Sequence, residues 1–344
     1  MQSEWLRRGW VSNLLAPLGG MVAALATLRR LAYARGWLAR EDCGLPVVVV
    51  GNLVAGGAGK TPTVMALVDA LGRAGHRPGV VSRGHGRVDS EDTAVRLVQI
   101  DTPARLAGDE PLLIHRRSGV PVAIGRDRVA AARALKAAHP SLTVILSDDG
   151  LQHRRLGRAV EVIVFDERGA GNGRCLPAGP LREPMSATPP QGAVIVYNSP
   201  AASTGWPGRR LERRLAGAVS LEGWWAGQPA TAAILQGLQD GPLIAAAGTA
   251  RPERFFDALR EAGLRFNRLP LPDHHPFIAL PWPADATDVI VTEKDAVKLV
   301  GRPLGRTRVW VAPLDCRLDS ETIVAVLARL PRPDPARGSG DSPG

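Results

Sequence analysis

The chain has 344 residues, enough for about two domains. Its 45% hydrophobic and 22% charged residues are normal for a folded globular protein, which excludes disorder over most of the length. The net charge is +10, and the first forty residues carry half of it, so contact with an anionic surface, a membrane or a nucleic acid, is favoured. Three widely spaced cysteines argue against a disulfide framework or a structural zinc site and fit a reducing compartment.

The first segment, residues 1–40, is predicted to be a membrane-associated helix. Its residues 11–28 carry no charge, and two arginines stand at each end of that run. A spanning helix needs about 20 apolar residues, whereas one proline and two glycines interrupt this shorter run. Three tryptophans surround it: Trp5, Trp10 and Trp37. Because indole rings favour the level of lipid headgroups, we expect an interfacial helix beside anionic lipid. The alternative is an amphipathic helix packed on the domain.

Strands and helices then alternate, which predicts a doubly wound α/β domain with a mostly parallel sheet over residues 41–198. The first strand is the run VVVV at 47–50, apolar all round as a buried parallel strand should be. A helix is expected from Lys60 to about 74. Further strands are expected at 79–82, 120–124, 144–147, 160–165 and 193–197, and further helices near 110 and 127.

The rest of the chain predicts a second, smaller unit. Residues 199–240, rich in Gly, Pro and Trp, are interpreted as a connector. A smaller C-terminal α/β domain is predicted for 241–330. Its strands are expected from 243, at 288–292 and at 309–312, and its helices at 252–262 and 321–330. The last residues, 331–344, have the composition of a disordered tail.

The segment that follows the first strand is typical of a phosphate-binding loop. In AGGAGKT, residues 55–61, glycines precede Lys60 and Thr61 at the start of a helix. Glycines let backbone amides close around phosphate oxygens, the lysine neutralises phosphate charge, and the threonine hydroxyl binds Mg²⁺. The usual first glycine is replaced by Val54, and a ligand-free glycine turn is the alternative. The predicted nucleotide-binding residues are Val54, Ala55, Gly56, Gly57, Ala58, Gly59, Lys60 and Thr61.

A later apolar strand ends in two carboxylates, Asp148 and Asp149, within TVILSDDGLQH. A P-loop enzyme needs such a strand-end aspartate to hold Mg²⁺ or its water, so the predicted metal site combines Thr61 with Asp148 or Asp149. Asp166, which ends VEVIVFD, is a weaker candidate. The DERG that begins there has no N-K-x-D guanine signature beside it, which disfavours a GTPase.

Three more loops end predicted strands, on the side where open α/β sheets bind ligands. They are SRGHG (82–86), GDEP (108–111) and GRDR (125–128). Each alone is more often a cap or a surface ion pair, but together with the P-loop they indicate one site. The second unit contains PDHHPF, with the only adjacent histidine pair. Neighbouring side chains point apart and no third ligand is evident, so an acid–base or phosphate-contacting histidine is expected rather than zinc.

In this order, the motifs resemble the tetraacyldisaccharide 4′-kinase family of lipid A biosynthesis. The matching strings are VVVVGNLVAGGAGKTP, SRGHG, GDEP, GRDR, SDDGLQH, GNGRCLPAGPLREP, DHHPF and VTEKDAVKL, between 47 and about 299. The family variant of the P-loop usually lacks the first glycine too. The resemblance implies transfer of the ATP γ-phosphate to the 4′-hydroxyl of a lipid-linked glucosamine disaccharide 1-phosphate, giving lipid IVA. It also implies a membrane-associated N-terminal helix at the cytoplasmic face of a Gram-negative inner membrane.

The resemblance also implies residue roles. Lys60 and the glycine amides would hold ATP. Asp109 of GDEP would accept the proton of the sugar hydroxyl, with support from His274, and Gln152 would support the metal or its waters. Candidates for phosphate contacts are Arg126 and Arg128.

Two other functions compete with this one. A P-loop ATPase that switches a protein partner would fit a deviant P-loop, but such loops carry an early lysine and residues 54–56 offer none. A nucleic-acid binder rests on charge alone, without a recognisable motif. We therefore expect ATP and Mg²⁺ as cofactors and the lipid disaccharide and an anionic membrane surface as partners, with no nucleic acid and no obligate protein partner.

Overall fold

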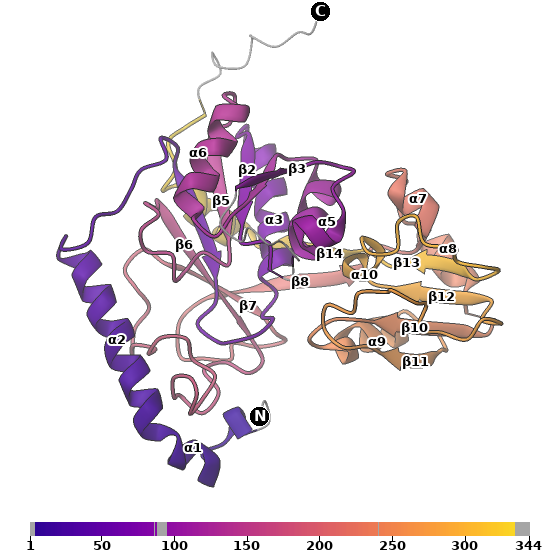
Figure 1. The fold of residues 1–344 in the computed structure, drawn as a ribbon, viewed down its shortest axis with the longest axis horizontal. Coiled ribbons are helices and arrows are strands. Elements are labelled where there is room, and N and C mark those ends of the chain that lie inside the picture. The colour runs from indigo at the N-terminus through magenta and orange to yellow at the C-terminus, as the bar shows by residue number, and fades with distance from the viewer. Residues whose placement is uncertain (1–3, 86, 88–94, 240, 334–344) are drawn as a thin grey trace, which may run out of the picture.

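The computed structural model describes residues 4–85, 87, 95–239 and 241–333. It contains two α/β units, each built on one sheet, that lie side by side (Figure 1). The larger sheet has nine strands in the order β14-β8-β7-β6-β1-β5-β2-β4-β3. Only the pairs β3–β4 and β14–β8, at its two edges, are antiparallel. Its strands are β1 (Val47–Gly51), β2 (Pro78–Ser82), β3 (Arg96–Val98), β4 (Val122–Ile124), β5 (Val144–Asp148), β6 (Val160–Asp166), β7 (Val194–Asn198), β8 (Arg209–Leu215) and β14 (Leu314–Leu318).

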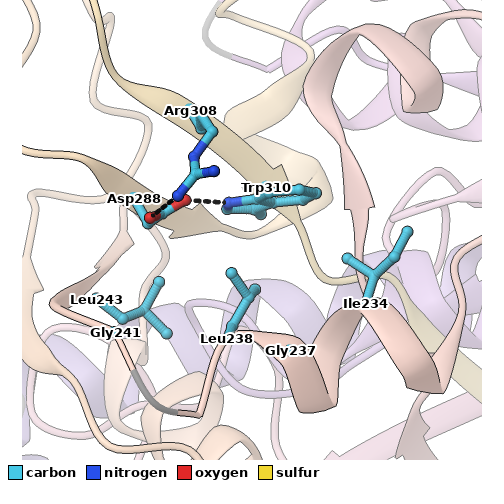
Figure 2. A pocket seen from close by; sticks show the side chains of 8 residues that line it. All are labelled: Ile234, Gly237, Leu238, Gly241, Leu243, Asp288, Arg308 and Trp310. Carbon is cyan, nitrogen blue, oxygen red and sulfur yellow. Dashed lines mark hydrogen bonds and ion pairs between the residues drawn. The ribbon is translucent and has the colours of Figure 1, made fainter.

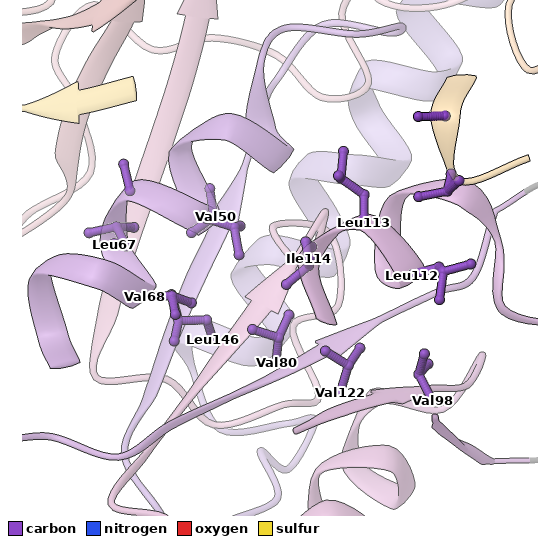
Figure 3. Packing of buried hydrophobic residues seen from close by; sticks show 14 of the residues in the cluster. Val50, Leu67, Val68, Val80, Val98, Leu112, Leu113, Ile114, Val122 and Leu146 are labelled. Carbon is purple, nitrogen blue, oxygen red and sulfur yellow. The ribbon is translucent and has the colours of Figure 1, made fainter. Parts of the chain in front are cut away.

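Helices cover both faces of this sheet, and the alternation of side chains along β1 shows how. Val48 and Val50 pack with α3 (Lys60–Arg73) and α5 (Asp109–Ser118) on one face. Val47 and Val49 belong to a second buried cluster, which contains α6 (Arg128–Ala138) on the other face. Figure 3 shows the first cluster, where side chains of α3 and α5 meet Val50 and other strand valines. The predicted doubly wound, mostly parallel sheet is confirmed.

The smaller sheet has the order β11-β10-β12-β13-β9, parallel except for β9. Its strands are β9 (Val219–Ser220), β10 (Leu243–Ala247), β11 (Asn267–Pro270), β12 (Asp288–Val291) and β13 (Arg308–Val311). Its helices are α7 (Leu221–Trp225), α8 (Ala232–Gly237), α9 (Pro252–Glu261) and α10 (Glu293–Ala296). Phe256 and Leu259 of α9 pack on Ile290 in a third buried cluster. We call this unit the small lobe, and the unit built on the nine-stranded sheet the large lobe.

The chain organisation differs from the prediction in two places. Residues 199–240, expected to be a connector, supply β8 to the larger sheet and β9, α7 and α8 to the small lobe. At the other end, β14 and α11 (Ser320–Leu327), expected within the 241–330 domain, return to the large lobe, where α11 contacts β7 and α3. The sequence of β8, RRLERRL, buries only Leu211, so it carries no apolar run that would predict a strand.

The N-terminal segment forms η1 (Glu4–Leu6), α1 (Trp10–Leu14) and α2 (Ala16–Ala34), which run along one side of the large lobe (Figure 1). One face of this segment is docked: the Ser12 hydroxyl donates to the Ala178 carbonyl at 2.7 Å, and Gly19 packs so closely that a Cβ would meet Ala178. No helix among the described residues has the length and apolar character needed to cross a bilayer. Residues 1–3, Gly86 of SRGHG and most of the expected tail, 334–344, lie outside the described residues.

Candidate active site

The P-loop and the paired aspartates lie at the same edge of the larger sheet. β1 and β5 are parallel neighbours, and Val50 of β1 stands opposite Asp148 of β5. From β1 the chain turns to one side for β5, β2 and β4 and to the other side for β6 and β7. Ligands bind outside the carboxyl ends of such sheets at the point where the strand order reverses. The loop that leaves β1 occupies that point.

A buried amide, Asn52, organises the P-loop from within. Its Nδ2 donates to the carbonyls of Val54 at 2.6 Å and Gly56 at 3.2 Å, while its Oδ1 accepts from Lys60 Nζ at 3.1 Å. The same side chain therefore sets the path of the loop and the position of the ammonium group. Asn52 was not among the predicted site residues, although it stands directly between the buried strand and the glycine run.

The unusual Val54 belongs to the support of the loop. It is fully buried and forms an antiparallel bridge with Leu181, and the next amide, that of Ala55, donates to the Pro180 carbonyl at 2.7 Å. Glycine is required further on, at Gly59, where φ is +89° and a Cβ would overlap the side chain of Asn198. The loop is thus clamped on both sides before α3 begins at Lys60.

The two aspartates have different surroundings. The Asp149 carboxylate lies 3.5 Å from Lys60 Nζ and 2.8 Å from Arg182 Nη1. Burial opposes ionisation of Asp149, but the charges of Lys60 and Arg182 hold its pKa below the usual value. Asp148 is almost fully buried, and its Oδ1 has no hydrogen-bond partner among the described residues. Burial, together with the charges of Glu110 and Asp149, raises the pKa of Asp148 to about 7.

The surroundings of Asp148 fit a divalent cation. A buried carboxylate oxygen without a donor is costly by itself and is stabilised by a positive charge. Thr61, in the first turn of α3, supplies a hydroxyl at the same sheet edge. The described residues contain no group of three His, Cys, Asp or Glu side chains that could hold a metal ion. Mg²⁺ is usually held by one or two carboxylates together with substrate phosphates rather than by a protein cage.

The other predicted metal and phosphate residues lie around this pair. Gln152 is committed to protein partners: its Nε2 donates to the Asn52 carbonyl and to Glu183, and its Oε1 accepts from Arg182. It therefore supports the arginine that binds Asp149, and its predicted contact with a metal stays a prediction. Arg128 is buried, which lowers its pKa to about 10 against the opposing charges of Asp148 and Asp149. Arg126, in contrast, is exposed.

The predicted catalytic pair comes from two lobes, 165 residues apart in the sequence. Asp109 begins α5 in the large lobe, and His274 lies in the loop after β11 in the small lobe. His274 Nδ1 is 3.0 Å from both carboxylate oxygens of Asp109. The two histidines of DHH do point to different partners, since His275 Nδ1 accepts from the Phe277 amide.

The contact between these two side chains shifts the pKa of each in the direction that favours its charged form. The hydrogen bond that His274 donates to Asp109 outweighs burial and raises the pKa of His274. Burial alone would raise the pKa of Asp109, but the hydrogen bond from His274 and the nearby charges of Lys294, His274 and Lys298 lower it below the usual value. An ionised carboxylate with an adjacent donor is suited to accept a proton from a hydroxyl group.

Arg168 is a part of the P-loop support that the motifs did not predict. Its guanidinium donates to the carbonyls of Ala55 and Gly57 and pairs with buried Asp166 at 2.8 Å. Asp166 was the weaker metal candidate, and its carboxylate is used to hold this arginine. Arg251 of the small lobe lies 3.5 Å from the same carboxylate. The sequence feature that could have indicated this contact is the strand end followed by DER.

The small lobe also contains a cavity of about 280 Å³ (Figure 2). It opens near the amino ends of β10, β12 and β13, whereas His274 and α10 follow carboxyl ends of small-lobe strands. Its one carboxylate, Asp288, accepts from Arg308 Nη2 at 2.6 Å and Trp310 Nε1 at 2.7 Å. Asp288 is therefore already paired.

The family model described as tetraacyldisaccharide-1-P 4′-kinase matches residues 11–331. The chain belongs to this family. It is 56% identical to the tetraacyldisaccharide 4′-kinase of Methylibium petroleiphilum over 320 residues, which cover 92% of this chain and 88% of that one. It is 52% identical to the protein of the same name from Leptothrix cholodnii over 343 residues, covering 97% of each.

A solved structure agrees with this assignment. The crystal structure of "apo" form LpxK from Aquifex aeolicus in complex with ATP matches with a TM-score of 0.76 and 25% identity, covering 93% of this chain and 99% of that chain. Membership of the family confirms the resemblance drawn from the motifs. The chain is accordingly a phosphotransferase, and a nucleotide-dependent switch on a protein partner is not favoured.

Proposed function

We propose that this kinase transfers the γ-phosphate of ATP to the 4′-hydroxyl of a tetraacyldisaccharide 1-phosphate at a membrane surface, giving lipid IVA. The observation that carries the proposal is the buried Asp109 carboxylate, paired with His274, in a chain that also places a P-loop and two strand-end aspartates at one sheet edge. A P-loop alone serves many reactions. A buried carboxylate paired with a histidine in the same chain indicates that a hydroxyl group is the acceptor.

The P-loop amides and Lys60 would bind the phosphates of ATP. The ammonium, now 3.1 Å from Asn52 and 3.5 Å from Asp149, has only to change partner to neutralise phosphate oxygens. Thr61 and Asp148 would hold Mg²⁺, which neutralises charge on the β- and γ-phosphates when bound. Asp149, which pairs with Lys60 and Arg182, would hold both cations near the bound phosphates.

Asp109 would orient the sugar hydroxyl and take its proton. As the hydroxyl oxygen bonds to the γ-phosphorus, the bond from that phosphorus to the bridging oxygen breaks, and ADP leaves with the electron pair. A sugar hydroxyl has a high pKa, so the proton moves to Asp109 late in the step. His274 holds the carboxylate in place through its Nδ1 hydrogen bond.

Asp148→Asn is expected to raise the Mg²⁺ concentration needed for half-maximal activity by about 10-fold or more, because the buried oxygen loses its charge. Titration of activity with MgCl₂ at saturating ATP measures this shift. Asp69→Asn, which alters an exposed carboxylate paired with Arg73 on α3, is the matched control. An unchanged Mg²⁺ requirement in Asp148→Asn would assign the metal to another residue.

The N-terminal helices suit a lipid surface. An apolar stripe remains exposed on α1 and α2 at intervals of three or four residues. Its members are Trp10, Leu14, Leu18, Met21, Leu25 and Leu28. Residues at this spacing share one helix face. The opposite face is docked on the large lobe through Ser12 and Gly19. We therefore favour an interfacial helix at the cytoplasmic face of the bacterial inner membrane, where ATP is available, over the packed-helix alternative.

Leu18→Ser combined with Leu25→Ser is expected to weaken binding to vesicles that contain anionic lipid by about 10-fold or more, since each leucine contributes up to about 2 kcal/mol on burial. The apparent KM for vesicle-borne substrate should rise while ATP affinity stays unchanged. Sedimentation with vesicles measures the binding. A control that replaces the exposed Ile100 and Val324 by serine should bind like the unaltered protein. Equal binding by both double variants would contradict the membrane role.

The function itself is tested with purified protein, ATP and Mg²⁺. Formation of ADP and of phosphorylated lipid is followed with the tetraacyldisaccharide 1-phosphate and, as a control, with the same lipid already phosphorylated at the 4′ position. We expect one ADP per lipid phosphorylated and little ADP with the control lipid. Equal ATP hydrolysis with and without an acceptor would instead favour an ATPase.

A further inference from the structure

Two lysines, one on a short helix of the small lobe and one in the turn after it, lie close to Asp109. The helix is α10, which follows β12 and starts at a Thr292 cap. Lys294 Nζ lies 3.0 Å from Asp273 Oδ1, 3.3 Å from Glu110 Oε1 and 4.0 Å from Asp109 Oδ2. It also lies 3.4 Å from His274 Nε2. One ammonium thus contacts both lobes, the proposed base and the histidine that holds it.

Lys298, one turn later, approaches the same carboxylate from another side. Its Nζ lies 3.7 Å from Asp109 Oδ2 and 3.1 Å from Asp295 Oδ1, and it stands over the ring of Phe277 at 5.2 Å. Both lysine side chains are largely buried, with exposed fractions of 16% for Lys294 and 8% for Lys298. Buried charges of this kind are costly unless they are paired. Each lysine has a nearer carboxylate of its own lobe, Asp273 for Lys294 and Asp295 for Lys298, and both also pair with Asp109.

The choice of lysine is unusual for this chain. Of its 43 basic residues only four are lysines, Lys60, Lys136, Lys294 and Lys298. Three of the four lie at the candidate active site. A guanidinium is planar and presents its donors in a fixed fork, whereas an ammonium is compact and its three donors can turn toward separate acceptors. Lys294 Nζ has three partners within hydrogen-bond distance, Glu110, Asp273 and His274, which matches the three donors of an ammonium. Asp109 is a fourth neighbour, at ion-pair distance.

We propose that Lys294 is a positioning residue for the phosphoryl transfer: its ammonium ties the His274 loop of the small lobe to the start of α5 and keeps Asp109 aimed and ionised. This inference rests on the proposed role of Asp109 as the base. Asp109 is then held in place only when the small lobe is docked on the large lobe. The residues that hold it, His274, Lys294 and Lys298, all come from the small lobe.

The charges around Asp109 determine in which direction its pKa changes when Lys294 is removed. Several charged or titratable groups face Asp109 or its partners. They are Glu110 on α5, Asp273 and His274 on the loop, Lys294, Asp295 and Lys298 on or beside α10, and His85 against the ring of His274. The lysine charges lower the pKa of Asp109, so removal of Lys294 raises it. Because Asp109 acts in its ionised form, the acid limb of the kcat profile then moves to higher pH.

The test compares Lys294→Gln with Lys294→Arg, and uses Lys136→Gln as the matched control, since Lys136 Nζ donates to the Gly44 carbonyl. The kcat and both KM values are measured from acidic to neutral pH. In Lys294→Gln we expect kcat to fall about 10-fold, with the acid limb displaced to higher pH and the KM for ATP unchanged. Lys294→Arg should return the acid limb toward its original position, and Lys136→Gln should behave like the unaltered protein.

A second variant is expected to shift the acid limb in the opposite direction. It lies on a half-exposed loop, where a substitution should leave the fold intact. Asp273→Asn removes an acidic neighbour of Lys294 and His274, so the acid limb should move to lower pH. An unmoved acid limb in both Lys294→Gln and Asp273→Asn overturns the inference, as does a drop in kcat that is the same at every pH. If Asp109→Asn in the same assay keeps its activity, the proposed function of Asp109 fails instead.

Discussion

Asp109→Asn is expected to lower kcat by about 10²–10⁴-fold while the Kd for ATP stays nearly unchanged. The carboxylate is buried and accepts from His274 Nδ1 at 3.0 Å, and asparagine keeps its shape but cannot take a proton. The nucleotide loop is built by Asn52 and Arg168, whose hydrogen bonds go to the loop itself, so ATP should still bind. Steady-state kinetics with the lipid acceptor and calorimetric titration with ATP measure the two quantities.

The control for this variant is Asp69→Asn, where an exposed carboxylate of α3 is changed and no effect on kcat is expected. His274→Gln should lower kcat less than Asp109→Asn, because it removes the partner and leaves the base. Loss of ATP binding in Asp109→Asn, with normal turnover at saturation, would reverse the roles and place Asp109 among the nucleotide-binding residues.

The sequence predicts the large lobe well because each of its parallel strands from β1 to β7 is an apolar run with a loop of polar residues at its end. The run at 47–50 and the run before Asp148 are buried on both faces, and such strands carry their own signal. Parallel strands end at one edge of a sheet. The amino-acid pattern alone therefore leads to the expectation that the P-loop, the aspartate pair and GDEP meet there.

The strands that the sequence did not predict, such as β8 and β14, have no apolar run that would mark them locally. β8 buries one leucine of seven residues, and β14 pairs with it from a position about a hundred residues later. Antiparallel pairing of this kind depends on where the chain returns and not on composition. For the same reason 199–240 was interpreted as a connector, although strands of both sheets lie in it.

The residues of the site also fall into those that a motif predicted and those that only the folded structure brings together. Thr61 and Asp148 belong to motifs whose residue types indicate nucleotide and metal binding. The family resemblance indicated Asp109 and His274. Lys294 lies 184 residues from Glu110 in the sequence, and only the folded chain brings the two together. Asn52 and Arg168 act through backbone carbonyls of the P-loop, which no side-chain motif records. The scarcity of lysine among 43 basic residues was the one clue to Lys294 available from composition.

Lys60→Ala is expected to remove most activity, by about 10²–10³-fold in kcat, because phosphate charge that develops in a water-poor site loses its partner. The ammonium lies between Asn52 Oδ1 and Asp149 Oδ1, at 3.1 and 3.5 Å. Asp149 would keep Arg182 at 2.8 Å, so the fold around the site should hold. Lys136→Ala is the matched control, with unchanged turnover expected, because Lys136 contacts the Gly44 carbonyl instead of the loop.

The measurement for Lys60→Ala is kcat at saturating lipid and ATP, together with thermal unfolding to verify that the variant is folded. A fall in kcat with intact unfolding behaviour assigns the loss to the site. Because the small lobe and its lysines are untouched in this variant, the contacts that hold Asp109 stay in place. The loss of activity therefore reports on phosphate binding alone. Near-normal turnover would mean that AGGAGKT does not hold the transferred phosphate, and that Arg128 or Arg182 neutralises it instead.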